Sequence, residues 1–278
     1  MERFKRRSYE GEGSLRRKVK LDVLRGVFRT VMRLARVILV FAVIFVAWEI
    51  ISHCKIIDPF YISKPSAFLI DLWSMFQTGY IYKHIYATVY EMLLGLLTGV
   101  ATGLIAGIIL AYSKTAYDLI APIFASINAM PRIAIAPLFI LWFGIGVLSK
   151  IALIWTTVFF IVFYNVFFGI KNVNENFINA ILVMGANKRQ IIRFVILPSI
   201  ISWLLASLRP SVAMALVGAI VGEMLASSEG LGWILIYATG LFYVTRVFSI
   251  LMLLALIGVA LDYSVRAMEK AFLKWRPA

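Results

Sequence analysis

Two arginines interrupt long apolar segments of the chain, and their type and position favour a chemical role. Arg132 lies inside the apolar run 118–146, and Arg209 stands near the middle of another, 200–221. A charge at such a position normally faces protein or water, because moving an ion into hydrocarbon is costly. Each arginine is therefore a candidate contact for an anion. Pairing within a helix bundle, or a position near the cytoplasmic face, explains Arg132 equally well, and Arg209 is expected to be paired or hydrated in the bundle interior.

The usual motifs of soluble enzymes are absent from the sequence. It has no Gly-x-x-x-x-Gly-Lys phosphate loop, no His-Glu-x-x-His motif, and no serine or cysteine triad with a matching histidine. The single cysteine, Cys54, excludes an internal disulfide and a cysteine-based metal cluster. We therefore expect no catalytic residue, no metal site and no cofactor bound by this chain, which cannot hydrolyse ATP itself.

The stretch from Lys171 to Pro198 is polar, basic and helix-patterned inside an otherwise apolar chain. Its apolar residues recur at three- and four-residue spacing: Val173, Phe177, Ile181 and Met184. This pattern predicts a short amphipathic helix that Gly185 ends as a C-cap glycine. A second basic turn, with Lys188, Arg189 and Arg193, then runs into Leu197-Pro198.

Composition identifies an integral membrane protein. Hydrophobic residues make up 62% and charged residues 15% of the 278 residues, whereas a soluble domain has roughly 45–50% apolar residues. The net charge of +14 is also what the cytoplasmic flanks of membrane helices require, so it does not call for nucleic acid. The basic N-terminal tail, residues 1–33, is expected on the cytoplasmic side, where anionic lipid attracts it.

Hydropathy and turn residues predict an all-α protein with six spanning helices and both termini in the cytoplasm. The predicted spans are about 34–51, 86–112, 118–146, 150–170, 200–221 and 247–265. They form a transmembrane domain over residues 34–268, followed by a cytoplasmic tail, 269–278. The amphipathic run 67–76 is expected to lie along the outer surface. External loops then hold Lys55, Lys64, Lys83, Lys150 and Arg246.

Small and helix-breaking residues mark two of these spans. The second span carries Gly95, Gly99, Gly103 and Gly107, a ridge that predicts close packing of another helix rather than a ligand groove. Glu91 near its outer end is expected at the membrane interface, with a place along a polar path as the alternative. In the third span, Pro131 and Pro137 permit local unwinding that exposes backbone groups to a pathway.

The basic stretch resembles the cytoplasmic loop signature of ABC importer membrane subunits, the permeases of binding-protein-dependent uptake systems. Gly185-Ala186, Val195 and Leu197-Pro198 have the spacing of that signature, although Asn179-Ala180-Ile181 stands where it usually begins Glu-Ala-Ala. In the family this loop is the coupling helix, which seats in a groove of the ATPase subunit. The resemblance implies this coupling role for Asn179, Ala180, Gly185, Ala186, Asn187, Lys188, Arg189, Leu197 and Pro198. Without the glutamate, a salt bridge to the ATPase from position 179 is not implied.

Two further stretches carry the same resemblance. Pro131, Ala134 and Pro137-Leu138, leading to the sequence Leu-Trp-Phe-Gly at 141–144, are similar to the branch that serves taurine, alkanesulfonates, nitrate and some vitamin precursors. Glu223 and the later Gly-Leu-Gly at 230–232 resemble an external element of these permeases. Glu223 is expected to act as a strut for the following loop or as part of an outer gate.

The resemblance covers roughly residues 60–275 and implies a type I ABC importer fold in a bacterial or archaeal inner membrane. It also implies two permease copies, an external solute-binding protein and two ATPase copies that hold ATP and Mg²⁺. The predicted function is a pathway for a small anionic solute that works by alternating access, with Arg132, Pro131, Pro137, Arg209 and Glu223 as its path or gate. An ion-coupled secondary transporter or channel is the alternative. Against it, the sequence shows no repeated half, and few buried carboxylates are available for proton coupling. An intramembrane enzyme is a more distant third.

Overall fold

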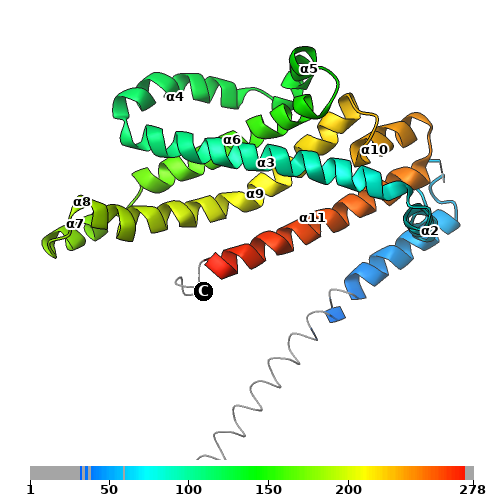
Figure 1. Ribbon diagram of the computed structural model, residues 1–278. Coiled ribbons are helices and arrows are strands. Elements are labelled where there is room, and N and C mark those ends of the chain that lie inside the picture. Colours follow the sequence, from blue (N-terminus) through cyan, green and yellow to red (C-terminus); the bar gives the residue numbers. More distant parts are fainter. Residues whose placement is uncertain (1–31, 33–34, 37–38, 59, 273–278) are drawn as a thin grey trace, which may run out of the picture. The chain divides into compact units, whose positions relative to one another are not determined.

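The computed structural model is helical, with no β-strand among its described residues, which are Met32, Ala35, Arg36, 39–58 and 60–272. The predicted N-terminal tail, apart from Met32, and residues 273–278 of the predicted C-terminal tail lie outside the described residues. An apolar helix, Leu39–His53, precedes α2 (Pro65–Gln77), α3 (Tyr80–Tyr112), α4 (Lys114–Ala129), α5 (Arg132–Phe143), α6 (Val147–Lys171), α7 (Glu175–Val183), α8 (Lys188–Ile191), the π-helical segment η1 (Ile192–Ile196), α9 (Leu197–Leu225), α10 (Leu231–Gly240) and α11 (Val244–Phe272) (Figure 1). The predicted all-α fold is confirmed.

The chain divides into two compact units, residues 1–67 and 68–278. In the first unit, Glu49 of the helix Leu39–His53 accepts hydrogen bonds from the Ser66 backbone N–H at 3.0 Å and the Ser66 hydroxyl at 2.8 Å. This carboxylate therefore ties the helix to the segment that follows it.

The second unit is organised around the contact between α3 and α6. A Cβ added at Gly95 would stand 2.5 Å from the Cβ of Ile154, one at Gly99 2.7 Å from that of Val158, and one at Gly107 3.0 Å from that of Val166. The glycine ridge therefore packs against a helix, as predicted. Because the contacts advance in the same direction along both helices, α3 and α6 run parallel.

Parallel neighbours require the chain between them to cross back, and α4 and α5 provide that return. These two helices are bent by 97° at the break between them, where the third span was predicted as a single interrupted helix over 118–146. Met130 is extended, with ψ 137°, because the Pro131 ring disfavours a helical residue before it. Pro137, where unwinding was also expected, lies inside α5.

α9 and α11 complete the bundle. α6 contacts α9 at three pairs: Gly169–Trp203, Ile154–Gly218 and Lys150–Gly222. The residue numbers fall along α6 as they rise along α9, so the two helices are antiparallel. Among the described residues, four helices are long and apolar enough to cross a membrane: α3, α6, the continuous stretch Lys188–Leu225 and α11. The bent pair raises the number to five. The helix Leu39–His53 is shorter, so a sixth crossing stays a prediction.

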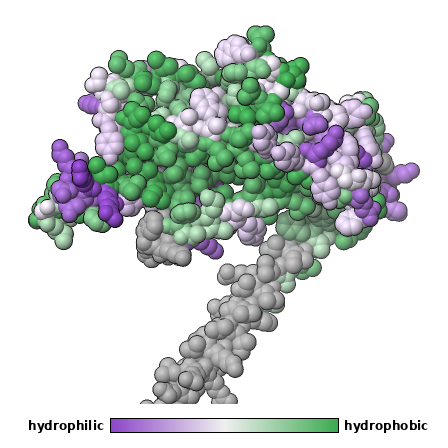
Figure 2. Space-filling model, viewed as in Figure 1, coloured by the Kyte–Doolittle hydropathy of each residue, from purple (hydrophilic) through white to green (hydrophobic). Residues whose placement is uncertain are grey.

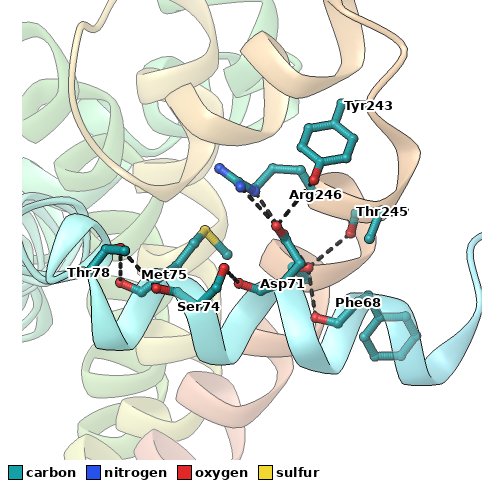
Figure 3. A network of polar contacts seen from close by, with 9 residues as sticks. Phe68, Asp71, Ser74, Met75, Thr78, Tyr243, Thr245 and Arg246 are labelled. Carbon is teal, nitrogen blue, oxygen red and sulfur yellow. Dashed lines mark hydrogen bonds and ion pairs between the residues drawn. The ribbon is translucent and has the colours of Figure 1, made fainter.

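A buried carboxylate fixes α2 to the start of α11. Asp71 accepts two hydrogen bonds of 2.8 Å from the Arg246 guanidinium, one of 2.8 Å from the Ser249 hydroxyl and one of 3.3 Å from the Tyr243 hydroxyl (Figure 3). Arg246 was expected in an external loop, but it lies in the first turn of α11 and is ion-paired. The opposite face of α2 exposes Ile70 and Trp73, which is the amphipathic pattern predicted for 67–76.

One face of the bundle has an apolar middle and polar ends. Figure 2 shows a hydrophobic face over α3, α4, α6 and α9, with hydrophilic residues gathered near α7 and α8 and again at the opposite end, near α10. A hydrophobic band between polar ends is the surface expected of helices that span a bilayer.

Candidate functional site

Residues 171–198, called the elbow below, form the two short helices that the sequence predicted. Asn174 caps α7, since its side chain accepts a hydrogen bond from the Asn176 N–H at 2.9 Å. At the other end Gly185 has φ +83°. Its N–H donates to Leu182 O at 2.9 Å, and the Ala186 N–H donates to Ile181 O at 3.1 Å. This is a Schellman pattern, so the prediction of a C-cap glycine is confirmed.

The second half of the elbow continues directly into α9. Asn187 and Gln190 form a reciprocal capping box, with hydrogen bonds of 3.0 and 2.7 Å. The chain then passes through the π-helical segment η1. Pro198 has no N–H to continue the α-helical pattern, and its ring crowds the carbonyl one turn earlier, so a wider turn relieves the clash. The basic turn therefore runs through Leu197-Pro198 and joins α9 as one helix.

The apolar side of α7 is uncovered. Val183 is 89% exposed and Met184 is 84% exposed, at the tip where the elbow turns. Asn179, Lys188 and Arg189 are exposed around it. Behind the tip, a cavity of about 720 Å³ separates α7 from the start of α9 and is lined by Phe177, Ala180, Ile181, Phe194, Pro198 and Trp203 among others. Exposed apolar side chains gathered in this way mark a contact with another protein or with a membrane.

Arg132 begins α5, directly after the helix break. A guanidinium N–H donates to Asn128 Oδ1, and the guanidinium carbon lies 5.5 Å from the centre of the Phe160 ring. Its Nε is buried and has no hydrogen-bond partner. Arg132 thus faces protein groups, one of the arrangements left open by the sequence, and Pro131 is the N-cap residue of α5.

Arg209 is balanced by acidic side chains of α11. Its Nε lies 3.2 Å from Asp262 Oδ1, and a terminal guanidinium nitrogen lies 3.1 Å from Glu269 Oε2. The side chain is about half exposed, so it is paired, as expected, but it is not enclosed within this single chain. Its contact with a transported anion stays a prediction.

Glu223 holds the start of α10. Three successive peptide N–H groups donate to side chains from two other helices: Gly230 to His84 Nδ1 at 3.1 Å, Leu231 to Thr88 Oγ1 at 2.9 Å, and Gly232 to Glu223 Oε2 at 2.7 Å. Glu223 is 1% exposed. This is the geometry of a strut for the loop. A role for Glu223 in an outer gate stays a prediction.

A buried ion pair next to this strut was missed by the sequence analysis. Glu91 and Lys150 form a salt bridge with side chains that are almost wholly buried, and Lys150 also donates to Ser227 Oγ at 3.0 Å. The predictions that Glu91 sits at the interface and Lys150 in an external loop were therefore wrong. The glycine ridge contained the signal: one step of four residues before the Gly95–Ile154 contact pairs position 91 with position 150.

The fold and these sites define an integral membrane protein with an exposed apolar tip at one end of its bundle. The chain belongs to the family described as the binding-protein-dependent transport system inner membrane component, which matches residues 99–274. The family resemblance inferred from the sequence is thereby confirmed.

Similar proteins within this family are transport permeases. The aliphatic sulfonates permease SsuC of Bacillus subtilis is 31% identical over 84% of this chain and 85% of its own length. The riboflavin permease RibX of Chloroflexus aurantiacus is 33% identical over 78% and 81%, and the taurine permease TauC of Escherichia coli is 28% identical over 84% and 87%. These relatives are permease components and not enzymes, in agreement with the prediction for this chain.

Solved structures of two transporters share the fold. A chain of the inward-facing MetNI methionine ABC transporter superposes with a TM-score of 0.60 at 18% identity, covering 69% of this chain and 95% of that one. A chain of an amino acid ABC transporter crystallised with histidines gives 0.58 at 19% identity, covering 74% and 98%. The helices are therefore arranged as in these ABC transporter chains.

Proposed function

We propose that this chain is the permease subunit of an ATP-driven importer and that it moves a small anionic solute, of the sulfonate, taurine or nitrate type, by alternating access. The observation that carries the proposal is the elbow, which has an exposed apolar tip and is continuous through α8 and η1 with the spanning helix α9. Relatives named for sulfonates and taurine support an anionic solute.

The elbow is the part that would receive force from an ATPase. Val183 and Met184 would enter a groove of that partner, while Lys188 and Arg189 would contact its rim. Because no loop separates α8 from α9, a displacement of the elbow would be transmitted along α9. Along its length α9 packs closely on α6, at Gly169–Trp203 and Ile154–Gly218. The ends of the pathway would then open and close through rigid helix movement.

The proposed assembly contains two copies of this permease, a cytoplasmic ATPase dimer that binds ATP and Mg²⁺, and an extracytoplasmic solute-binding protein. It would lie in the inner membrane of a bacterium or archaeon, in contact with lipid, with residues 1–33 and 269–278 as cytoplasmic tails of a transmembrane domain at 34–268. No nucleic acid and no cofactor bound by this chain are part of the proposal. Arg132, Pro131 and Pro137 would border the path, with Arg209 and Glu223 near its walls.

Co-expression with the ATPase encoded nearest to this gene tests the coupling role. The wild-type permease is expected to retain the ATPase in a pull-down and to stimulate ATP hydrolysis when solute-binding protein is added. Val183→Asp and Met184→Asp place a charge in the buried contact and are expected to abolish retention. Leu241→Asp is the matched control, because Leu241 is an exposed apolar residue at the α10 end. Solute uptake by vesicles that lack the ATPase would instead favour the secondary transporter.

A further inference from the structure

Arg132 differs from the other cations inside the described bundle, because no carboxylate balances its charge. Those other cations are paired: Lys150 with Glu91, Arg209 with Asp262 and Glu269, and Arg246 with Asp71. Among the described residues Arg132 has only the amide oxygen of Asn128 and the face of Phe160. A cation held at membrane depth without a counter-ion is costly, and such residues mark ligand or ion pathways.

A cavity of about 250 Å³ lies beside this arginine. It is bordered by the break between α4 and α5, by α6 and by α9, and its walls include Met130, Leu153, Met214 and Val217. The lining hydroxyl, that of Thr157, already donates to Leu153 O at 3.3 Å. Apart from Arg132, the cavity is thus mainly apolar, and its two methionines supply flexible side chains that adapt to a ligand.

The N-terminus of α5 opens at the same place. Arg132 and Ile133 are its first residues and both line the cavity. The first N–H groups of a helix lack intrahelical acceptors, and Pro131 provides no capping side chain. A helix N-terminus favours an anion through these N–H groups and through the helix dipole. Arg132, whose charge no carboxylate balances, and the N-terminus of α5 therefore border the same end of a mainly apolar cavity.

We propose that this cavity is a transmembrane binding site for an organic anion that carries a short apolar chain. The anionic group would contact Arg132 and the first peptide N–H groups of α5, and the chain would lie against Met130, Met214 and Val217. The inference rests on the proposed function in one respect, namely that the permease conducts anions. It adds the location of the site and a preference for alkyl anions over inorganic ones.

The shape and polarity of the cavity account for that preference. Its volume equals the liquid volume of about eight water molecules, which is room for an anionic group and a chain of a few carbons. An inorganic anion such as nitrate would find donors on one side and apolar walls on the other, so its lost hydration would be only partly replaced. Each added CH₂ that enters the cavity is expected to tighten binding about fourfold.

A cysteine-protection experiment on the permease–ATPase complex in nanodiscs tests the site. Cys54 is the single cysteine, so Cys54→Ser supplies a background in which Val217→Cys places one thiol in the cavity wall. The rate of its modification by N-ethylmaleimide is measured with methanesulfonate, ethanesulfonate, butanesulfonate, nitrate and butanol as probes. The half-protecting concentration is expected to fall about fourfold for each CH₂, with little protection by nitrate or butanol.

Charge variants separate the role of Arg132 from that of a general cation. Arg132→Gln is expected to weaken protection by butanesulfonate at least about tenfold, whereas Arg266→Gln, which removes an exposed guanidinium paired with Asp262, is expected to retain it. Equal protection by nitrate and butanesulfonate, or protection unchanged by Arg132→Gln, would overturn the proposal. If the Arg132→Gln complex does not assemble, the proposal is tested on the wild-type complex instead. Butanesulfonate is then expected to raise the thermal midpoint of that complex, and an unchanged midpoint would overturn the proposal.

ATP hydrolysis by the same complex distinguishes this inference from the proposed function. A Val217→Cys complex that assembles and hydrolyses ATP but shows no protection would refute the cavity as a binding site while leaving the coupling role intact. A permease that never retains its ATPase would count against the proposed function instead.

Discussion

At the scale of single residues, polar groups at the α10 end of the bundle work as structural ties. The carboxylate of Glu223 accepts a hydrogen bond from a peptide N–H of the α10 N-terminus while almost fully buried. Its removal leaves a buried donor without an acceptor, which costs about 1–3 kcal/mol. Glu223→Ala is expected to lower the free energy of unfolding by this amount, seen as a lower thermal midpoint in nanodiscs.

The amide variant provides the control for this position. Glu223→Gln keeps an oxygen that can accept from the Gly232 N–H, so it is expected to lose less stability than Glu223→Ala. If Glu223→Ala unfolds at the wild-type temperature, the carboxylate does not hold the loop. If the two variants are equally destabilised, the hydrogen bond at Gly232 is not the source of the effect.

The buried pair Glu91–Lys150 is expected to behave as one unit. Removing either partner strands a charge in the bundle, and such changes cost about 3–5 kcal/mol. Glu91→Leu and Lys150→Met should each destabilise the protein strongly, while the double variant should be closer to wild type than either. Thermal unfolding of the four proteins in a double-mutant cycle measures this coupling. Additive losses in the double variant would show that the two residues contribute independently.

At the scale of elements, the α3–α6 contact depends on the absence of side chains along one ridge. A methyl group at Gly99 would meet the Cβ of Val158 at 2.7 Å, so one helix must shift. Gly99→Ala is therefore expected to destabilise the protein by about 1–3 kcal/mol. Gly258→Ala in α11 is the matched control, because nothing lies within 4 Å of the added methyl group; it should be neutral or stabilising by up to about 1 kcal/mol. A similar thermal midpoint for both variants would argue against the ridge contact.

Local patterns predicted the elements of this protein better than the contacts between them. The spacing of apolar residues predicted α7, and a glycine after its last turn predicted its C-cap, because both are set by neighbours in the chain. The right-angle break at Pro131 and the π-helical turn before Pro198 depend on how each helix packs after the proline. For the same reason the partners of Arg209, which come from another helix, could not be assigned from sequence. The pairing of Lys150 with Glu91 follows from the glycine ridge only once the contact of that ridge with α6 is known.

At the scale of the whole molecule, helix directions constrain the topology. Since α3 and α6 are parallel, the chain must return between them, so α4 and α5 together are expected to cross the membrane rather than enter and leave on one side. α9 is antiparallel to α6, which places the elbow and the loop before α10 at opposite ends. The elbow is basic, with Lys171, Lys188, Arg189 and Arg193, and a basic end is expected in the cytoplasm.

Single cysteines in the Cys54→Ser background test both parts of this topology with a membrane-impermeant maleimide. Ser228→Cys and Ile145→Cys, both at exposed positions near the α10 end, are expected to react in intact spheroplasts. Met184→Cys and Lys114→Cys, exposed at the elbow end, should react only in inverted vesicles. Labelling of Lys114→Cys and Ile145→Cys from the same side would mean that α4 and α5 form a re-entrant loop, which the parallel packing of α3 and α6 does not allow. Labelling of Met184→Cys in intact spheroplasts would place the elbow outside the cell, away from any source of ATP, and the coupling role would then be untenable.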